Sequence, residues 1–126
     1  MDFLDTAEKI ASFFIDHIPA DGHIPVDFLQ PEKPHIEDST AAAIAACGFI
    51  ELEKHTGKGI YVDTAIRLLR TLDADRADYS AETDNILRKC TGSYHGAKDR
   101  EVGFVYADYY YIEALLKLLG KAIEIW

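Results

Sequence analysis

The chain has 126 residues, of which 48% are hydrophobic and 28% charged. These proportions argue against intrinsic disorder, and the length fits one domain that buries about two-thirds of its unfolded surface. The formal net charge of −9 argues against a nucleic-acid partner, because phosphate binding needs clustered Lys and Arg side chains. The first residues lack the pattern of an export signal, and no apolar stretch reaches the ~18 residues that span a bilayer. We therefore expect a cytoplasmic protein without a membrane partner.

The N-terminal segment combines helical spacing of apolar residues with a proline-rich continuation. The apolar residues that recur every three or four positions are Phe3, Ala7, Ile10, Phe14 and Ile18. This spacing predicts an amphipathic helix over about residues 3–18, ended by Pro19. Residues 19–37 hold all four prolines and an Asp-Gly sequence, which predict a long loop. Loops of this length in compact domains usually have a function or cover something.

A second helix is expected over about residues 38–55. Asp38 or Ser39 can cap its first turn, and Gly57 suits the left-handed position after its last turn. From Ala41 to Ile50 the residues are small or apolar and leave no polar face. We therefore expect this helix to be packed on every side in the middle of the fold.

Three further helices are predicted in the rest of the chain. A helix over about residues 59–73 forms an antiparallel hairpin with the preceding one, because only a few residues link them. A shorter helix over about 81–90 is followed by a loop over 91–103 with three glycines, and a last helix spans about 107–119. Helical periodicity dominates and no pair of alternating segments indicates a strand hairpin. The expected fold is all-α, a single helical domain or fragment made of antiparallel helical hairpins.

No metal or cofactor site is indicated. Cys47 and Cys90 lie far apart, and neither has a Cys or His at metal-ligand spacing, so both are interpreted as reduced structural thiols. The histidines show no His-x-x-x-His or His-Glu-x-x-His pattern. Nucleophile-elbow, phosphate-loop and dinucleotide-binding motifs are also absent.

Three segments together resemble a known enzyme family. In chain order they are Asp38-Ser39-Thr40-Ala41-Ala42-Ala43, Ser93-Tyr94-His95-Gly96 and Tyr106-Ala107-Asp108-Tyr109-Tyr110. The chain from about Phe13 to Leu119 resembles the C-terminal third of glycoside hydrolase family 88, the unsaturated glucuronyl hydrolases. The resemblance implies that the helical hairpins are the last part of an (α/α)6 barrel. It also implies a carbohydrate-active enzyme of bacterial glycan breakdown.

The reaction implied by the resemblance is the hydration of a vinyl ether. The family acts on unsaturated uronate oligosaccharides left by polysaccharide lyases, adds water across the double bond and releases the next sugar. Two aspartates are central there, since a carboxyl with a raised pKa can donate a proton and take one back from water. Both lie upstream of the resembling third and have no counterpart in this chain. We therefore assign no catalytic residue and expect the chain alone to be inactive.

The glycine-rich loop carries the candidate substrate-binding residues Ser93, His95 and Lys98. Some family members hold a sulfate with a Ser-x-x-Ser-x-Lys motif, which residues 93–98 resemble except that Gly96 stands in place of the second Ser. A hydroxyl, backbone N–H groups and a Lys suit an oxyanion, such as that of an anionic oligosaccharide. Lys98 and Arg100, with His95 nearby, form a local positive cluster that can outweigh the distant negative charges. The alternative interpretation is a solvated loop with incidental polar residues.

Two aspartates and a group of tyrosines allow a structural and a functional interpretation. Asp38 and Asp108 stand at helix starts, where a capping role stabilises a helix by ~1 kcal/mol without any function. Tyr106, Tyr109, Tyr110 and Tyr111 suit core packing with tethered hydroxyls better than a sugar platform.

Two functions from different classes fit these observations. The first is a part or relative of an unsaturated glucuronyl hydrolase. The second is a non-catalytic helical module that uses its exposed faces for self-association. A piece of a barrel exposes apolar flanks that upstream hairpins would cover and that are rare on monomers, so we expect the chain by itself to form a homo-oligomer, a closed symmetric dimer or larger.

Overall fold

The computed structural model describes residues 3–121, which form four α-helices and one short 3-10 helix. These are α1 (Phe3–Asp16), α2 (Ser39–Thr56), α3 (Ile60–Asp75), η1 (Ala97–Asp99) and α4 (Val105–Leu118). Within the described residues the only β-structure consists of isolated bridges, so the predicted all-α class is confirmed. None of these helices is long and apolar enough to cross a membrane.

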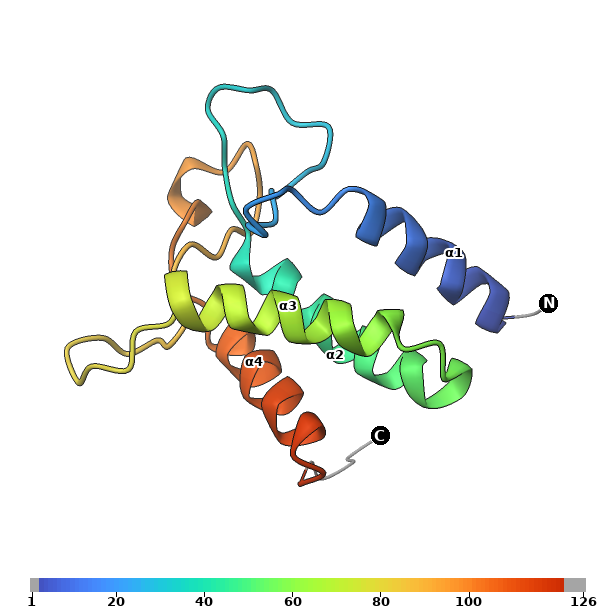
Figure 1. Ribbon diagram of the computed structural model, residues 1–126. Coiled ribbons are helices and arrows are strands. Elements are labelled where there is room, and N and C mark those ends of the chain that lie inside the picture. Colours follow the sequence, from blue (N-terminus) through green and yellow to red (C-terminus); the bar gives the residue numbers. More distant parts are fainter. Residues whose placement is uncertain (1–2, 122–126) are drawn as a thin grey trace.

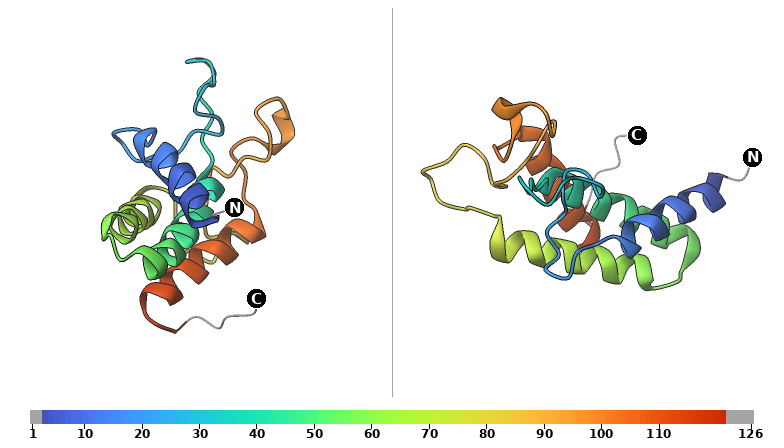
Figure 2. Two further views of the ribbon diagram at one scale, coloured as in Figure 1. Left: turned by 90° about the vertical axis from the view of Figure 1, so that its right-hand side faces the viewer. Right: turned by 90° about the horizontal axis from the view of Figure 1, so that it is seen from above.

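Helix α2 lies at the centre of the bundle. Helices α2 and α4 run in one direction and α1 and α3 in the other, and the three other helices surround α2 (Figures 1 and 2). Residues without any exposed surface in the three packed helices are Ala43 and Ala46 of α2, Ala65 and Leu68 of α3, and Ala107 and Ala114 of α4. The five alanines among them are small, which lets the axes of facing helices approach closely.

The link between α2 and α3 satisfies the backbone at both helix ends. Helix α2 ends at Gly57, whose φ of 62° is left-handed and whose N–H donates to the Glu53 carbonyl at 2.8 Å. The Glu53 carboxylate accepts the N–H groups of Gly59 and Val62 at 2.7 and 3.2 Å. Glu53 thus supplies the side-chain acceptor that starts α3, and the antiparallel hairpin expected here is confirmed.

Helix α2 is not packed on every side, which corrects the sequence-based expectation. Ile44 is 42% exposed and Gly48 is exposed, while Ala41 and Ala45 are only half-buried. These four residues follow one another at helical spacing and form a single face. That face is open because α1 covers α2 only in part: Ala11 of α1 is buried, and the ring of Phe14 lies 5.7 Å from that of Phe49.

The helix expected over residues 81–90 does not form, although the other four predicted helices are found with ends that differ by no more than two residues. The segment is irregular, with an antiparallel bridge between Ala77 and Leu87. Its N–H groups bond to distant acceptors instead of a preceding turn. The Asp108 carboxylate accepts the N–H groups of Ile86 at 3.0 Å and Leu87 at 2.8 Å. Tertiary hydrogen bonds thus override the local helical pattern.

The first turn of α4 explains how Asp108 reaches this segment. Helix α4 begins at Val105, two residues earlier than expected, and its N-cap residue is Phe104. Asp108 therefore lies inside the helix and is not a cap, which corrects that interpretation. It is only 9% exposed, and its Oδ2 also accepts the Asn85 amide at 3.3 Å. Asp38, in contrast, does cap α2 by accepting the Thr40 N–H at 3.0 Å.

Leucine substitutions on two faces of α2 should give opposite results. Ala42 is 2% exposed, so Ala42→Leu overpacks the core and should lower the free energy of unfolding by about 1–3 kcal/mol. Ala45 borders the open face, and Ala45→Leu should change it by less than about 0.5 kcal/mol. Urea unfolding of both variants measures the difference. Equal losses of stability would show that the face at Ala45 is covered, either within the chain or by another molecule.

Asparagine substitutions should separate the roles of the two aspartates. Asp108 accepts N–H donors on both carboxylate oxygens, so Asp108→Asn turns one acceptor into a donor and should cost about 1–3 kcal/mol. Asp38 accepts the N–H groups of Thr40 and Thr91 on Oδ1 alone, at 3.0 Å each. The single oxygen of an Asn side chain can replace it, so Asp38→Asn is the matched control with a smaller loss. A larger loss in Asp38→Asn than in Asp108→Asn would contradict these roles.

Candidate functional site

Both long connections of the chain lie at one end of the bundle, which we call the loop end. The loop over residues 17–38 leads into α2, and the loop over residues 76–104 leads into α4 (Figure 1). The two loops are joined directly, because the Ser39 N–H donates to the Lys89 carbonyl at 2.9 Å and the Thr91 hydroxyl to the Glu37 carbonyl at 2.6 Å. The start of α2 is therefore held against the loop that leads into α4.

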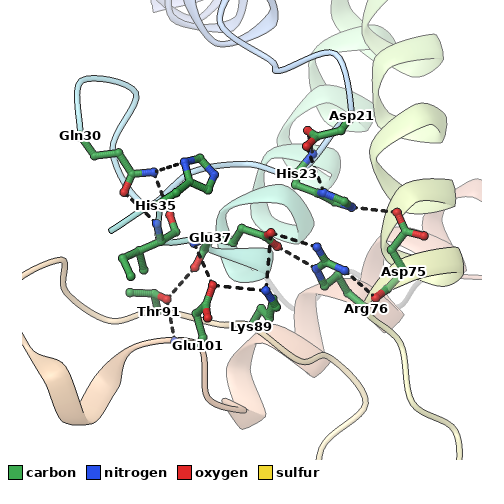
Figure 3. A network of polar contacts seen from close by, with 11 residues as sticks. Asp21, His23, Gln30, His35, Glu37, Asp75, Arg76, Lys89, Thr91 and Glu101 are labelled. Carbon is green, nitrogen blue, oxygen red and sulfur yellow. Dashed lines mark hydrogen bonds and ion pairs between the residues drawn. The ribbon is translucent and has the colours of Figure 1, made fainter. Parts of the chain in front are cut away.

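A network of charged side chains crosses the loop end (Figure 3). Arg76 donates to both carboxylate oxygens of Glu37, at 2.8 Å from Nε and 3.0 Å from Nη2. Lys89 Nζ lies 3.7 Å from Glu37 and 3.5 Å from Glu101. The side chains of Glu37 and Arg76 are only 13% and 15% exposed, so this bidentate pair is shielded from water. It fixes the loop before α2 to the end of α3.

The electrostatics of Glu37 follow from these contacts. Burial disfavours its charged form, but the hydrogen bonds and charge of Arg76, assisted by Lys89, outweigh burial and lower the pKa of the carboxyl below its ordinary value of 4.5. Nearby, the His23 ring is placed between two carboxylates, with Nδ1 3.4 Å from Asp21 and Nε2 2.8 Å from Asp75. The sequence patterns did not identify this network, because its partners are far apart in the chain.

The predicted substrate-binding residues lie on the loop before α4, and all three are exposed. Ser93, His95 and Lys98 surround the η1 turn, but among the described residues no hydrogen bond or ion pair joins any two of them. The structure therefore places them on one loop without showing a formed anion site. The Asp99 carboxylate is also close, since a Cβ at Gly96 would stand 3.4 Å from its Oδ2.

Tyr94 and Arg100 hold this loop in place. The Arg100 guanidinium lies 5.2 Å from the centre of the Tyr94 ring and donates from Nε to the Tyr94 carbonyl at 2.6 Å. The Tyr94 hydroxyl donates to the Pro34 carbonyl at 3.3 Å, which connects the loop to the one before α2. Arg100 is thus occupied locally, which leaves Lys98 as the exposed cation of the predicted cluster.

An apolar groove of about 720 Å³ runs along α2 to the loop end. Its walls are Ile10 and Phe14 of α1, and its floor is the open face of α2. At the loop end it is bordered by polar groups of Asp38, Thr91 and Tyr106. Burial and the nearby Asp38 carboxylate raise the pKa of the Tyr106 hydroxyl, so this group stays protonated near neutral pH. The groove is called the α1–α2 groove below.

Tyr111 and the two cysteines have structural roles. Tyr111 is 1% exposed, and its hydroxyl lies 2.8 Å from that of Tyr79. Cys47 and Cys90 are buried free thiols, and burial raises the pKa of Cys47 to about 12. These thiols are therefore not reactive nucleophiles. The described residues contain no group of three or more His, Cys, Asp or Glu side chains arranged to hold a metal ion.

Acid titration should reveal the ion pair at the loop end. Because the pKa of Glu37 is lowered in the folded protein, its contribution is fully present above pH 4.5 and is lost as the pH falls through the folded pKa. Glu37→Gln should therefore lower the free energy of unfolding by about 1–3 kcal/mol at neutral pH, and the difference from the parent should shrink below pH 4.5. Urea unfolding at several pH values measures this. A difference that is independent of pH would contradict the assignment.

Comparisons with known proteins identify relatives of one kind, although no family model matches the chain. The unsaturated glucuronyl hydrolase of Bacillus sp. (strain GL1) is 36% identical over an alignment that covers 99% of this chain and 35% of that protein. The unsaturated glucuronyl hydrolase of Formosa agariphila is 34% identical over an alignment that covers 90% of this chain and 30% of that protein. A crystal structure of the Bacillus sp. GL1 enzyme, responsible for the degradation of glycosaminoglycan, matches with a TM-score of 0.86 and 31% identity. That match covers 93% of this chain and 33% of the enzyme.

These matches show that the proteins are related and how much of each chain the relationship covers. The helical barrel of the relatives agrees with the all-helical fold found here, and the resemblance seen in the sequence is confirmed. The chain spans about a third of the length of the curated relatives that it matches. Along nearly its whole length, the chain is homologous to the unsaturated glucuronyl hydrolases.

Proposed function

We propose that the chain acts as the C-terminal part of an unsaturated glucuronyl hydrolase, on unsaturated uronate oligosaccharides produced by polysaccharide lyases. The observation that carries this proposal is the TM-score of 0.86, with 31% identity, over 93% of the chain. In this role the chain contributes one sector of a helical barrel. The complete enzyme adds water across the vinyl ether double bond of the terminal uronate and releases the next sugar.

The catalytic carboxyl groups in this proposal belong to the two-thirds of the enzyme outside the chain. The hydrogen bonds of the two candidate aspartates support this division. Both oxygens of Asp108 accept backbone N–H groups in a buried position, and Oδ1 of Asp38 accepts two. A general acid must present its oxygen to the substrate within hydrogen-bond reach. These aspartates are instead directed at the protein's own backbone.

The part of the substrate assigned to this chain is its anionic end. The exposed residues are Ser93, His95 and Lys98. They lie on a loop that Tyr94 and Arg100 hold in place, at the loop end, where α2 and α4 begin. A hydroxyl and an ammonium group on one fixed loop suit a carboxylate or sulfate oxygen. With Gly96 in place of a second hydroxyl, the loop offers fewer donors, so we propose weak anion contacts that position the sugar.

A chimeric enzyme tests the proposed activity. Joining this chain to the other two-thirds of the Bacillus sp. GL1 relative should give an enzyme that removes the ultraviolet absorbance of an unsaturated disaccharide. The isolated chain should show no turnover, because loss of an acid–base group alone typically costs two to four orders of magnitude in rate. Turnover by the isolated chain, or a folded chimera without activity, would contradict the proposal.

The same chimera tests the binding residues. Lys98→Ala should raise KM several-fold for an anionic disaccharide and leave kcat nearly unchanged, because the contact holds substrate and transition state alike. Lys121→Ala, which removes an exposed charge after the end of α4, is the matched control and should leave both constants unchanged. An unchanged KM in Lys98→Ala would remove this residue from the site.

A second function, self-association without catalysis, is favoured by a separate observation. The chain carries an open apolar groove on α2 and further exposed apolar side chains on α4 and at its C-cap, among them Val105 at 78% and Leu119 at 66% exposure. Contiguous apolar surfaces of this kind are uncommon on monomers and mark sites of association.

A further inference from the structure

Two separate apolar surfaces lie on different edges of the molecule. The first is the α1–α2 groove, with the small residues Ala41, Ala45 and Gly48 along its floor. The second, called the α4 stripe, consists of Val105, Ile112 and Leu116 of α4 and its C-cap residue Leu119, exposed by 78%, 43%, 37% and 66%. The opposite face of α4 packs on α2, with Lys117 2.6 Å from Glu51, so the α4 stripe points away from the bundle.

The shapes of the two surfaces are complementary. The groove has a floor of small side chains, which lets the axis of another helix approach closely. The α4 stripe presents larger side chains at spacings of three, four and seven residues, which is the pattern of an amphipathic helix that lies in a groove. Neither surface contains a charged residue along its length, and Asp38 stands only at the loop end of the groove. One surface can therefore bury the other without desolvating an unpaired charge.

The direction of the helices determines how two copies can meet. Helices α2 and α4 both begin at the loop end and run side by side within the chain (Figures 1 and 2). Suppose that α4 of another copy enters the groove parallel to α2. It would then be related to α2 of the first copy as α2 is related to α4 within one chain. This contact is head-to-tail, since it joins two different surfaces. A twofold pair would have to match one surface with itself and would leave the other surface bare.

We propose that three copies of this chain associate head-to-tail into a closed ring, with the α4 stripe of each copy in the α1–α2 groove of the next. The number three comes from the geometry of the relatives. Each copy supplies two helix pairs, and the chain matches 33% of a helical barrel with a TM-score of 0.86. Repeating one-third of a closed barrel three times closes it again, and a closed ring leaves no apolar edge exposed. The proposal rests on the self-association function given above.

Light scattering of the purified chain tests the ring. At micromolar concentration the mass should be three times the 14.1 kDa of one chain. Ile44→Glu disables the groove, and Ile112→Glu disables the stripe. Because these residues are 42% and 43% exposed in the single copy, each variant should still fold but fall to one-third of the parent mass. Leu29→Glu, at an 87% exposed position on a loop outside both surfaces, is the control and should keep the parent mass.

Mixing the two variants gives the decisive measurement. A copy with Ile44→Glu keeps an intact α4 stripe, and a copy with Ile112→Glu keeps an intact groove, so the mixture can form one good contact. The mass should double to that of a heterodimer and stop there. A mixture that stays monomeric, or a parent chain that is a monomer or a dimer, would overturn the ring. Those outcomes leave the hydrolase proposal untouched, because its test is the activity of the chimera.

Discussion

The structure depends on carboxylates that satisfy the backbone of its long loops. Two irregular connections, over residues 17–38 and 76–104, meet at one end of a small bundle, where buried N–H groups need partners. Asp38 accepts the Thr91 N–H at 3.0 Å, and Asp108 accepts those of Ile86 and Leu87. Asp38 is the N-cap of α2 and Asp108 lies in the first turn of α4, so each helix positions the carboxylate and the carboxylate in turn positions the loop.

This arrangement limits what the same residues can do chemically. A carboxylate whose oxygens are occupied by backbone donors stabilises the fold and is poorly placed to exchange protons with a ligand. The Glu37–Arg76 pair works in a similar way, since both side chains are largely shielded and its contacts join the first loop to α3. The loop end is therefore cross-linked by shielded contacts. Ser93, His95 and Lys98 are exposed on it, and in the function proposed above a fixed backbone beneath them would favour defined contacts with the ligand.

The accuracy of the sequence-based predictions depended on the range of the interactions involved. The four helices with their own periodicity and caps were predicted to within two residues, because spacing and capping are local signals. Residues 81–90 were predicted wrongly as a helix, because the carboxylate that holds Ile86 and Leu87 lies more than twenty positions further along the chain. The pair of Glu37 and Arg76 was missed for the same reason. The motif around Ser93 located an exposed loop, but its role in binding remains a prediction.

The open face of α2 shows why composition alone misjudged the most central helix. A run of alanines with Ile44 and Gly48 indicates that another helix can approach closely, but it does not say whether that helix belongs to the same chain. In a closed barrel a central helix has a parallel neighbour on each side, whereas within residues 3–121 α4 is the parallel neighbour on one side of α2 and the α1–α2 groove lies along its open face (Figure 2). Filling the α1–α2 groove adds apolar contacts that the single copy cannot make. Anything that binds only the folded form also stabilises it by mass action, so the stability of this chain should rise with the concentration of whatever fills the groove.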